Sequence, residues 1–189
     1  MSSHHVVREK QEPALLVLGL DSFDQELLGQ LLEWSPTVIA TSQTVEKLNS
    51  LCIKIDWIIT DSMNEVEQSD VKIMGANGNS LVNAALEYLT ASEYPSVNIV
   101  TDALDLNDYL PYANKINLVI FNNNKRIFPV SPGFSKWKPM GETIRILSPV
   151  KGIQSNGLKR IDDSCYETAQ DGIFTLGFNE PFIFIAEDL

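Results

Sequence analysis

Histidine and cysteine are scarce in this chain of 189 residues, which contains two of each. The histidines, His4 and His5, are adjacent near the N-terminus, so the sequence excludes a Ser-His-Asp or Cys-His nucleophile system and a histidine-based zinc site. Cys52 and Cys165 lie far apart and neither belongs to a CxxC pair. We therefore expect free thiols rather than a disulfide or a zinc site.

Basic residues and long apolar runs are also in short supply. The chain has 14 Lys and Arg against 25 Asp and Glu, a formal net charge of −11. Nucleic acids and anionic membranes bind to basic surfaces, so neither is an expected partner. No apolar run approaches the roughly 20 residues that span a bilayer, and the opening MSSHHVVREKQEP lacks the apolar core of a signal peptide. These features predict a folded cytoplasmic protein.

Short apolar runs alternate with segments of helical periodicity in the first part of the chain. The alternation predicts a Rossmann-like, mostly parallel sheet covered by helices over residues 1–115. In the first expected helix, Ser22 and Gln25 have the spacing of a capping box. The expected strands are ALLVLGL, TVIA, DWII, VKIM and SVNIV, and the expected helices are SFDQELLGQLLEW, TVEKLNSL and SLVNAALEYL.

Helical periodicity fades after Asn117. The stretch NLVIFNNNKRIFPV reads as a hairpin around an Asn-rich turn, because asparagine tolerates positive φ. ETIRILSP, GIFTL and PFIFIAED add strand-like runs separated by Gly, Pro and Asn. The sequence therefore predicts an antiparallel β-sandwich domain over residues 116–189.

Asp61 is separated by one residue from the apolar run Trp57–Ile59, which would deliver its carboxylate to the open end of a parallel sheet. Sites that hold Mg²⁺ against a nucleotide usually gather two or more acids, and here Met63 and Asn64 follow. The residues alone leave two interpretations open, a remnant of a phosphoryl-transfer site and a polar cap at a strand end.

Several motifs, in the same order, resemble thiamin pyrophosphokinases. CIKIDWIITDSMN is similar to the family's GIKPDLIIGDFDS-type segment, and NAALEYL, NLVIFNNNKRIFPV, GETIRILSP and GLKR are similar to its later motifs. The resemblance implies transfer of a diphosphoryl group from ATP to thiamin with Mg²⁺. It also implies a homodimer, with a catalytic-domain-like first half and a thiamin-binding-domain-like second half.

The resemblance also implies site residues. Asp61 falls on the first acid of the Gly-Asp-x-Asp-Ser motif, which gives it a catalytic and metal-binding role, and Asn64 falls on the serine, which implies cofactor binding. Asn179 falls on the asparagine of a Ser-Asn pair and is also expected to bind the cofactor.

Two further segments are matched less closely. VTDALDLND corresponds to the family's Gly-Gly-Arg-x-Asp-His stretch; we assign Asp105 to catalysis and Asp102 to cofactor binding, with Asp108 as an alternative. Asn79, in MGANGNS, is assigned to cofactor binding through a phosphate-holding nest, while a plain loop before the Ser80 helix cap is the competing interpretation.

Other family positions have lost their functional groups. Met63 replaces the second acid, Leu81 replaces the acid of a Thr-Asp pair, and no Gly or Arg remains in VTDALDLND. Met and Leu cannot coordinate a hard cation, so the sequence predicts that catalysis is reduced or lost while small-ligand binding is kept. Two alternatives stay open, an active ATP:thiamin diphosphotransferase and a non-enzymatic scaffold. A response-regulator receiver fits poorly, because its acid pair and lysine are missing.

Overall fold

A computed structural model of the chain describes residues 12–61, 71–76 and 78–189. The chain divides into two compact units, Met1–Leu118 and Val119–Leu189. The division falls inside strand β6 (Asn117–Asn122), close to the change of periodicity in the sequence.

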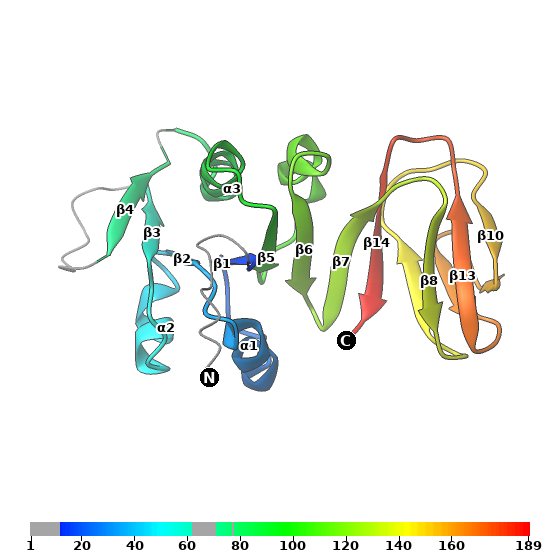
Figure 1. Cartoon of the computed structure of the whole chain (residues 1–189), viewed down its shortest axis with the longest axis horizontal. Coiled ribbons are helices and arrows are strands. Elements are labelled where there is room, and N and C mark those ends of the chain that lie inside the picture. Colours follow the sequence, from blue (N-terminus) through cyan, green and yellow to red (C-terminus); the bar gives the residue numbers. More distant parts are fainter. Residues whose placement is uncertain (1–11, 62–70, 77) are drawn as a thin grey trace, which may run out of the picture. The chain divides into compact units, whose positions relative to one another are not determined.

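The first unit contains a sheet whose described strand pairs are all parallel (Figure 1). Its strands lie in the order β5-β1-β2-β3-β4. The strand bounds are β1 Ala14–Val17, β2 Val38–Thr41, β3 Trp57–Thr60, β4 Lys72–Gly75 and β5 Ser96–Val100. The helices are α1 Gln25–Leu32, α2 Val45–Ser50 and α3 Leu81–Ala91, followed by the 3₁₀ helices η1 Leu106–Asp108 and η2 Leu110–Tyr112.

The chain reverses direction across this sheet. It runs outward from β1 through β2 and β3 to β4, and α3 then returns it to β5 on the other side of β1. The reversal makes the gap between the carboxyl ends of β1 and β5 the topological switch point, where open α/β sheets bind ligands.

Two helix starts show how local sequence sets the element bounds. Ser80 caps α3 as predicted, since its Oγ accepts a hydrogen bond from the Asn83 backbone N–H at 3.2 Å. The expected capping box at Ser22 is wrong. Asp24 caps α1 instead, accepting from the Leu27 N–H at 2.9 Å, and the Ser22 hydroxyl is bonded elsewhere.

The second unit contains two antiparallel sheets. One has the order β11-β12-β9-β14-β7-β6 and the other the order β10-β13-β8. The further bounds are β7 Lys125–Val130, β8 Phe134–Lys138, β9 Thr143–Ile146, β10 Gln154–Asn156, β11 Leu158–Arg160, β12 Cys165–Thr168, β13 Gly172–Gly177 and β14 Ile183–Asp188. The predicted Asn turn joins β6 to β7, with φ of 48° at Asn123 and 59° at Asn124.

Both sheets of the second unit contribute to one apolar core. Val130, Ile144 and Ile185 from the larger sheet are buried with Phe174 and Leu176 from the smaller one. This arrangement is a β-sandwich, so the predicted fold class, a Rossmann-like α/β part followed by an antiparallel β-sandwich, is confirmed. None of the helices among the described residues has the length and hydrophobicity needed to cross a membrane.

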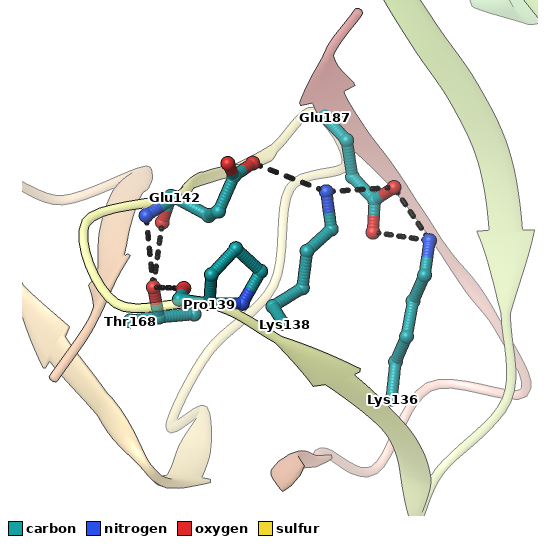
Figure 2. A network of polar contacts seen from close by, with 6 residues as sticks. All are labelled: Lys136, Lys138, Pro139, Glu142, Thr168 and Glu187. Atoms are coloured by element: carbon teal, nitrogen blue, oxygen red, sulfur yellow. Dashed lines mark hydrogen bonds and ion pairs between the residues drawn. The ribbon is translucent and has the colours of Figure 1, made fainter. Parts of the chain in front are cut away.

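Charged side chains cross the interior of the sandwich at one place (Figure 2). Glu187 on β14 is 3% exposed, and its two carboxylate oxygens accept hydrogen bonds from Lys136 Nζ on β8 at 2.8 and 2.6 Å. Lys138 Nζ lies 3.4 Å from Glu187 Oε2 and 3.3 Å from Glu142 Oε2. The network ties the smaller sheet to the larger one.

Candidate functional site

Five chain segments meet where the parallel strands of the first unit end, because parallel strands present their carboxyl ends at the same edge of a sheet. We call this the carboxyl edge. It includes residues 18–24 after β1, 42–44 after β2, Asp61 after β3, 76–80 after β4 apart from residue 77, and 101–105 after β5.

Asp61 lies at the carboxyl edge as predicted, with an exposed side chain immediately after β3. Among the described residues, no three His, Cys, Asp or Glu side chains converge in a way that would hold a metal ion. Mg²⁺ is often bound by one or two carboxylates together with substrate phosphates, so Asp61 could hold it only with other oxygen ligands. Asn64 lies outside the described residues.

Asp102 joins the two loops that flank the switch point. Its Oδ2 accepts a hydrogen bond from the Asp21 backbone N–H at 2.9 Å. Its Oδ1 accepts from the Ser22 N–H at 3.3 Å and from the Ser22 Oγ–H at 3.2 Å. Gly19 allows this approach, since a Cβ at this position would lie 2.3 Å from Asp102 Oδ2. The turn after β1 is therefore folded around the Asp102 carboxylate.

Asp105 is exposed and caps η1. Its Oδ1 accepts from the backbone N–H of Asn107 at 2.9 Å and from the Asn107 side-chain amide at 2.8 Å. The following Tyr109 is 1% exposed. Burial raises the pKa of the Tyr109 hydroxyl, and the nearby carboxylates of Asp108 and Asp105 raise it further. Tyr109 therefore stays protonated at neutral pH. The catalytic role assigned to Asp105 stays a prediction.

Asn79 lies in the turn that leads into α3. Its backbone N–H donates to the Ala76 carbonyl at 2.9 Å, and the preceding Gly78 has φ of 85°. A phosphate-holding nest needs its N–H groups to point outward, whereas this one closes the turn before the Ser80 cap. The geometry favours the loop interpretation, and the side-chain amide is the part of Asn79 left for ligand contact.

Asn179 belongs to the second unit, in the exposed part of the loop between β13 and β14. The preceding Phe178 anchors that loop in the sandwich core. The next residue, Glu180, has a buried carboxylate oxygen, Oε2, that has no hydrogen-bond partner within the described part of the chain. The cofactor-binding role of Asn179 stays a prediction.

Lys47 places a cation at the carboxyl edge that the sequence reasoning missed. From α2, its Nζ donates to the Leu20 carbonyl at 2.5 Å and lies 3.6 Å from Asp21 Oδ1. The available signal was a lysine in the short helix after β2. Close by, Thr44 Oγ1 is buried and donates to the Val17 carbonyl at 3.1 Å, which links the ends of β1 and β2.

The two-part architecture, a Rossmann-like unit with its switch point at β1 and β5 followed by a β-sandwich, is found in solved thiamin pyrophosphokinases. The enzyme from Geobacillus thermodenitrificans is similar over 93% of this chain and 97% of its own, with a TM-score of 0.69 and 12% identity. The Bacillus subtilis enzyme is similar over 94% and 99%, with a TM-score of 0.62 and 13% identity. The Candida albicans enzyme is similar over 94% and 89%, with a TM-score of 0.65 and 10% identity.

The chain therefore has the thiamin pyrophosphokinase fold, which confirms the fold that the sequence motifs implied. No sequence model of a known protein family matches the chain. No curated protein matches it either.

Proposed function

We propose that this chain is a divergent member of the thiamin pyrophosphokinase family that binds a small ligand and has reduced or lost catalysis. The composition of the carboxyl edge carries the proposal. Asp61 remains and is exposed, whereas the position matched to the acid of the family's Thr-Asp pair, at the first residue of α3, is occupied by Leu81. Asp102 and Asp105 both accept hydrogen bonds from the protein itself.

The charges at this edge argue against tight binding of ATP. Lys47 is held by the Leu20 carbonyl and by Asp21, so its charge is already partly compensated. Four further carboxylates at the edge belong to Asp24, Asp61, Asp102 and Asp105. A triphosphate would meet net negative potential unless Mg²⁺ came with it, whereas thiamin or a similar cationic heterocycle would not be repelled. ATP is therefore proposed as a weak ligand or none, with Mg²⁺ needed only for residual activity.

The second unit supports a homodimer as part of the proposal. Trp137 on β8 and Ile173 on β13 are cross-strand neighbours, 60% and 65% exposed. Large exposed apolar side chains that lie together mark interaction surfaces. Light scattering of the purified protein at tens of micromolar would give twice the 21.1 kDa chain mass if this holds, and 21.1 kDa if it does not.

The deciding experiment has two measurements on the native chain and on Asp61→Asn. One is formation of thiamin diphosphate with Mg²⁺ or Mn²⁺, and the other is calorimetric titration of thiamin and of ATP. The control Glu33→Gln changes an exposed acid at the C-terminal end of α1. Thiamin binding without turnover supports the proposal. Robust turnover that Asp61→Asn abolishes would support the alternative of an active kinase. If neither thiamin nor ATP binds, the result would support the alternative of a non-enzymatic scaffold.

A further inference from the structure

The turn after β1 offers three hydrogen-bond donors to a single anionic group. They are the backbone N–H groups of Asp21 and Ser22 and the Ser22 hydroxyl, at 2.9, 3.3 and 3.2 Å from the Asp102 carboxylate. None of the three belongs to the first turn of α1, where Asp24 already accepts from the Leu27 N–H. The turn therefore forms an anion cradle of its own, defined by Gly19, Asp21 and Ser22.

The cradle lies where a ligand anion would bind in this class of sheet. The switch point between β1 and β5 is the usual ligand crevice, and the loop after the first strand commonly approaches a phosphate through backbone N–H groups. Asp102 is exposed, so solvent reaches this place. Gly19 leaves no side chain in the way, since any Cβ there would lie 2.3 Å from the carboxylate oxygen.

We propose that the Asp102 carboxylate occupies the position of a ligand phosphate and so excludes phosphate and diphosphate groups from the turn after β1. A phosphate oxygen pair and a carboxylate compete for the same donors, and two anions in contact would repel each other. Asp102 thus determines ligand specificity at the switch point, because it admits ligands without a phosphate at this position. The inference holds whether or not the chain binds thiamin.

The proposal predicts that removing the carboxylate creates a binding site for free anions. In Asp102→Ala the three donors lose their acceptor, while Gly19 still leaves the approach to them free of a side chain. Formate would replace the missing carboxylate, and inorganic phosphate would take the same donors. Asp21→Ala is the matched control: it also removes an acid from this turn, from a side chain that is 93% exposed, but leaves Asp102 in place.

The test is thermal unfolding of the full-length native chain, Asp102→Ala, Asp102→Ser and Asp21→Ala in sodium chloride, formate or phosphate at equal ionic strength. At ten times the dissociation constant, an anion should raise the Tm of the two Asp102 variants by about 3 to 6 °C beyond the native response. Asp21→Ala should respond like the native chain. Calorimetric titration of phosphate and of pyrophosphate should show at least tenfold tighter binding to the Asp102 variants.

Equal responses of all four proteins would overturn the proposal, as would native binding of phosphate as tight as that of the variants. Asp102→Ser keeps one hydroxyl acceptor for the turn and is the milder change. If Asp102→Ala is isolated unfolded, formate or phosphate should refold it while chloride does not, and failure of both anions would also count against the proposal.

Discussion

Replacing Glu187 by glutamine would remove the buried charge that joins the two sheets of the sandwich. The change replaces the anionic partner of Lys136 at 2.6 and 2.8 Å by a neutral amide, while Lys138 keeps Glu142 at 3.3 Å. Removing one partner of a buried ion pair costs about 3–5 kcal/mol. Because the Lys136 side chain is 31% exposed and can turn toward water, we expect the lower end, about 3 kcal/mol.

Urea and thermal unfolding would measure this cost. For a chain of this size, 3 kcal/mol corresponds to a Tm decrease of roughly 6–12 °C. The matched control is Asp188→Asn, because Asp188 is the next residue on β14 and pairs with Lys125 on β7 but is 49% exposed. Breaking that exposed pair should cost less than about 1 kcal/mol. A Glu187→Gln variant within about 1 kcal/mol of the native chain would refute the reasoning.

The double variant Lys136→Met, Glu187→Leu separates the cost of an unpaired charge from the contribution of the pair. It removes both charges while keeping similar side-chain volumes. Such replacements are often neutral or stabilising, so the double variant should be more stable than Glu187→Gln and within about 1 kcal/mol of the native chain. A double variant as unstable as Glu187→Gln would show that the loss arises from packing rather than from charge.

Four further variants test single features by the same unfolding assays. Gly19→Ala would place a Cβ 2.3 Å from Asp102 Oδ2 and should cost about 1–3 kcal/mol, whereas Gly29→Ala, with open space around it in α1, should stabilise by about 0.5–1 kcal/mol. Asp24→Ala removes the α1 cap and should cost about 1 kcal/mol. Two backbone N–H donors lower the pKa of Asp162 below its ordinary value, so its contribution is present above pH about 4 and is lost as the pH falls further. Asp162→Asn should therefore flatten the acid side of the stability profile, and an unchanged profile would contradict this.

The parts of the fold that the sequence predicted are those that local chemistry determines. Four of the five parallel strands, all but the edge strand β4, are short apolar runs that are largely buried, with β1 0% exposed at every position. Ser80 marks the start of α3, and paired asparagines with positive φ mark the β6–β7 turn. Each of these signals lies within a few residues of the structure it determines.

The edge strand β8 shows why some strands of the second unit were not predicted from the sequence. Its sequence FSKWK turns Lys136 and Lys138 inward and leaves Trp137 60% exposed, the reverse of a hydrophobic-in pattern. The inward lysines are stabilised by Glu187, which lies 51 residues from Lys136 in the chain. A local sequence pattern cannot indicate a partner at that separation.

The aspartates after β5 show the same limit at the candidate site. Sequence reasoning matched their segment to a family motif but could not separate Asp102, Asp105 and Asp108, because spacing alone does not reveal hydrogen-bond partners. In the structure Asp102 is bonded to a turn about 80 residues away, Asp105 caps η1, and Asp108 lies near the buried hydroxyl of Tyr109.

These contacts change how readily each aspartate could bind a ligand or a metal ion. A carboxylate that already accepts several hydrogen bonds from its own chain must give up some of them before it can hold an ion or a proton of a ligand. Asp102 and Asp105 carry that cost, whereas no hydrogen bond or ion pair within the described residues engages the exposed Asp61. Any residual chemistry at the carboxyl edge should therefore depend most on Asp61, which is why Asp61→Asn separates an active kinase from a ligand-binding relative.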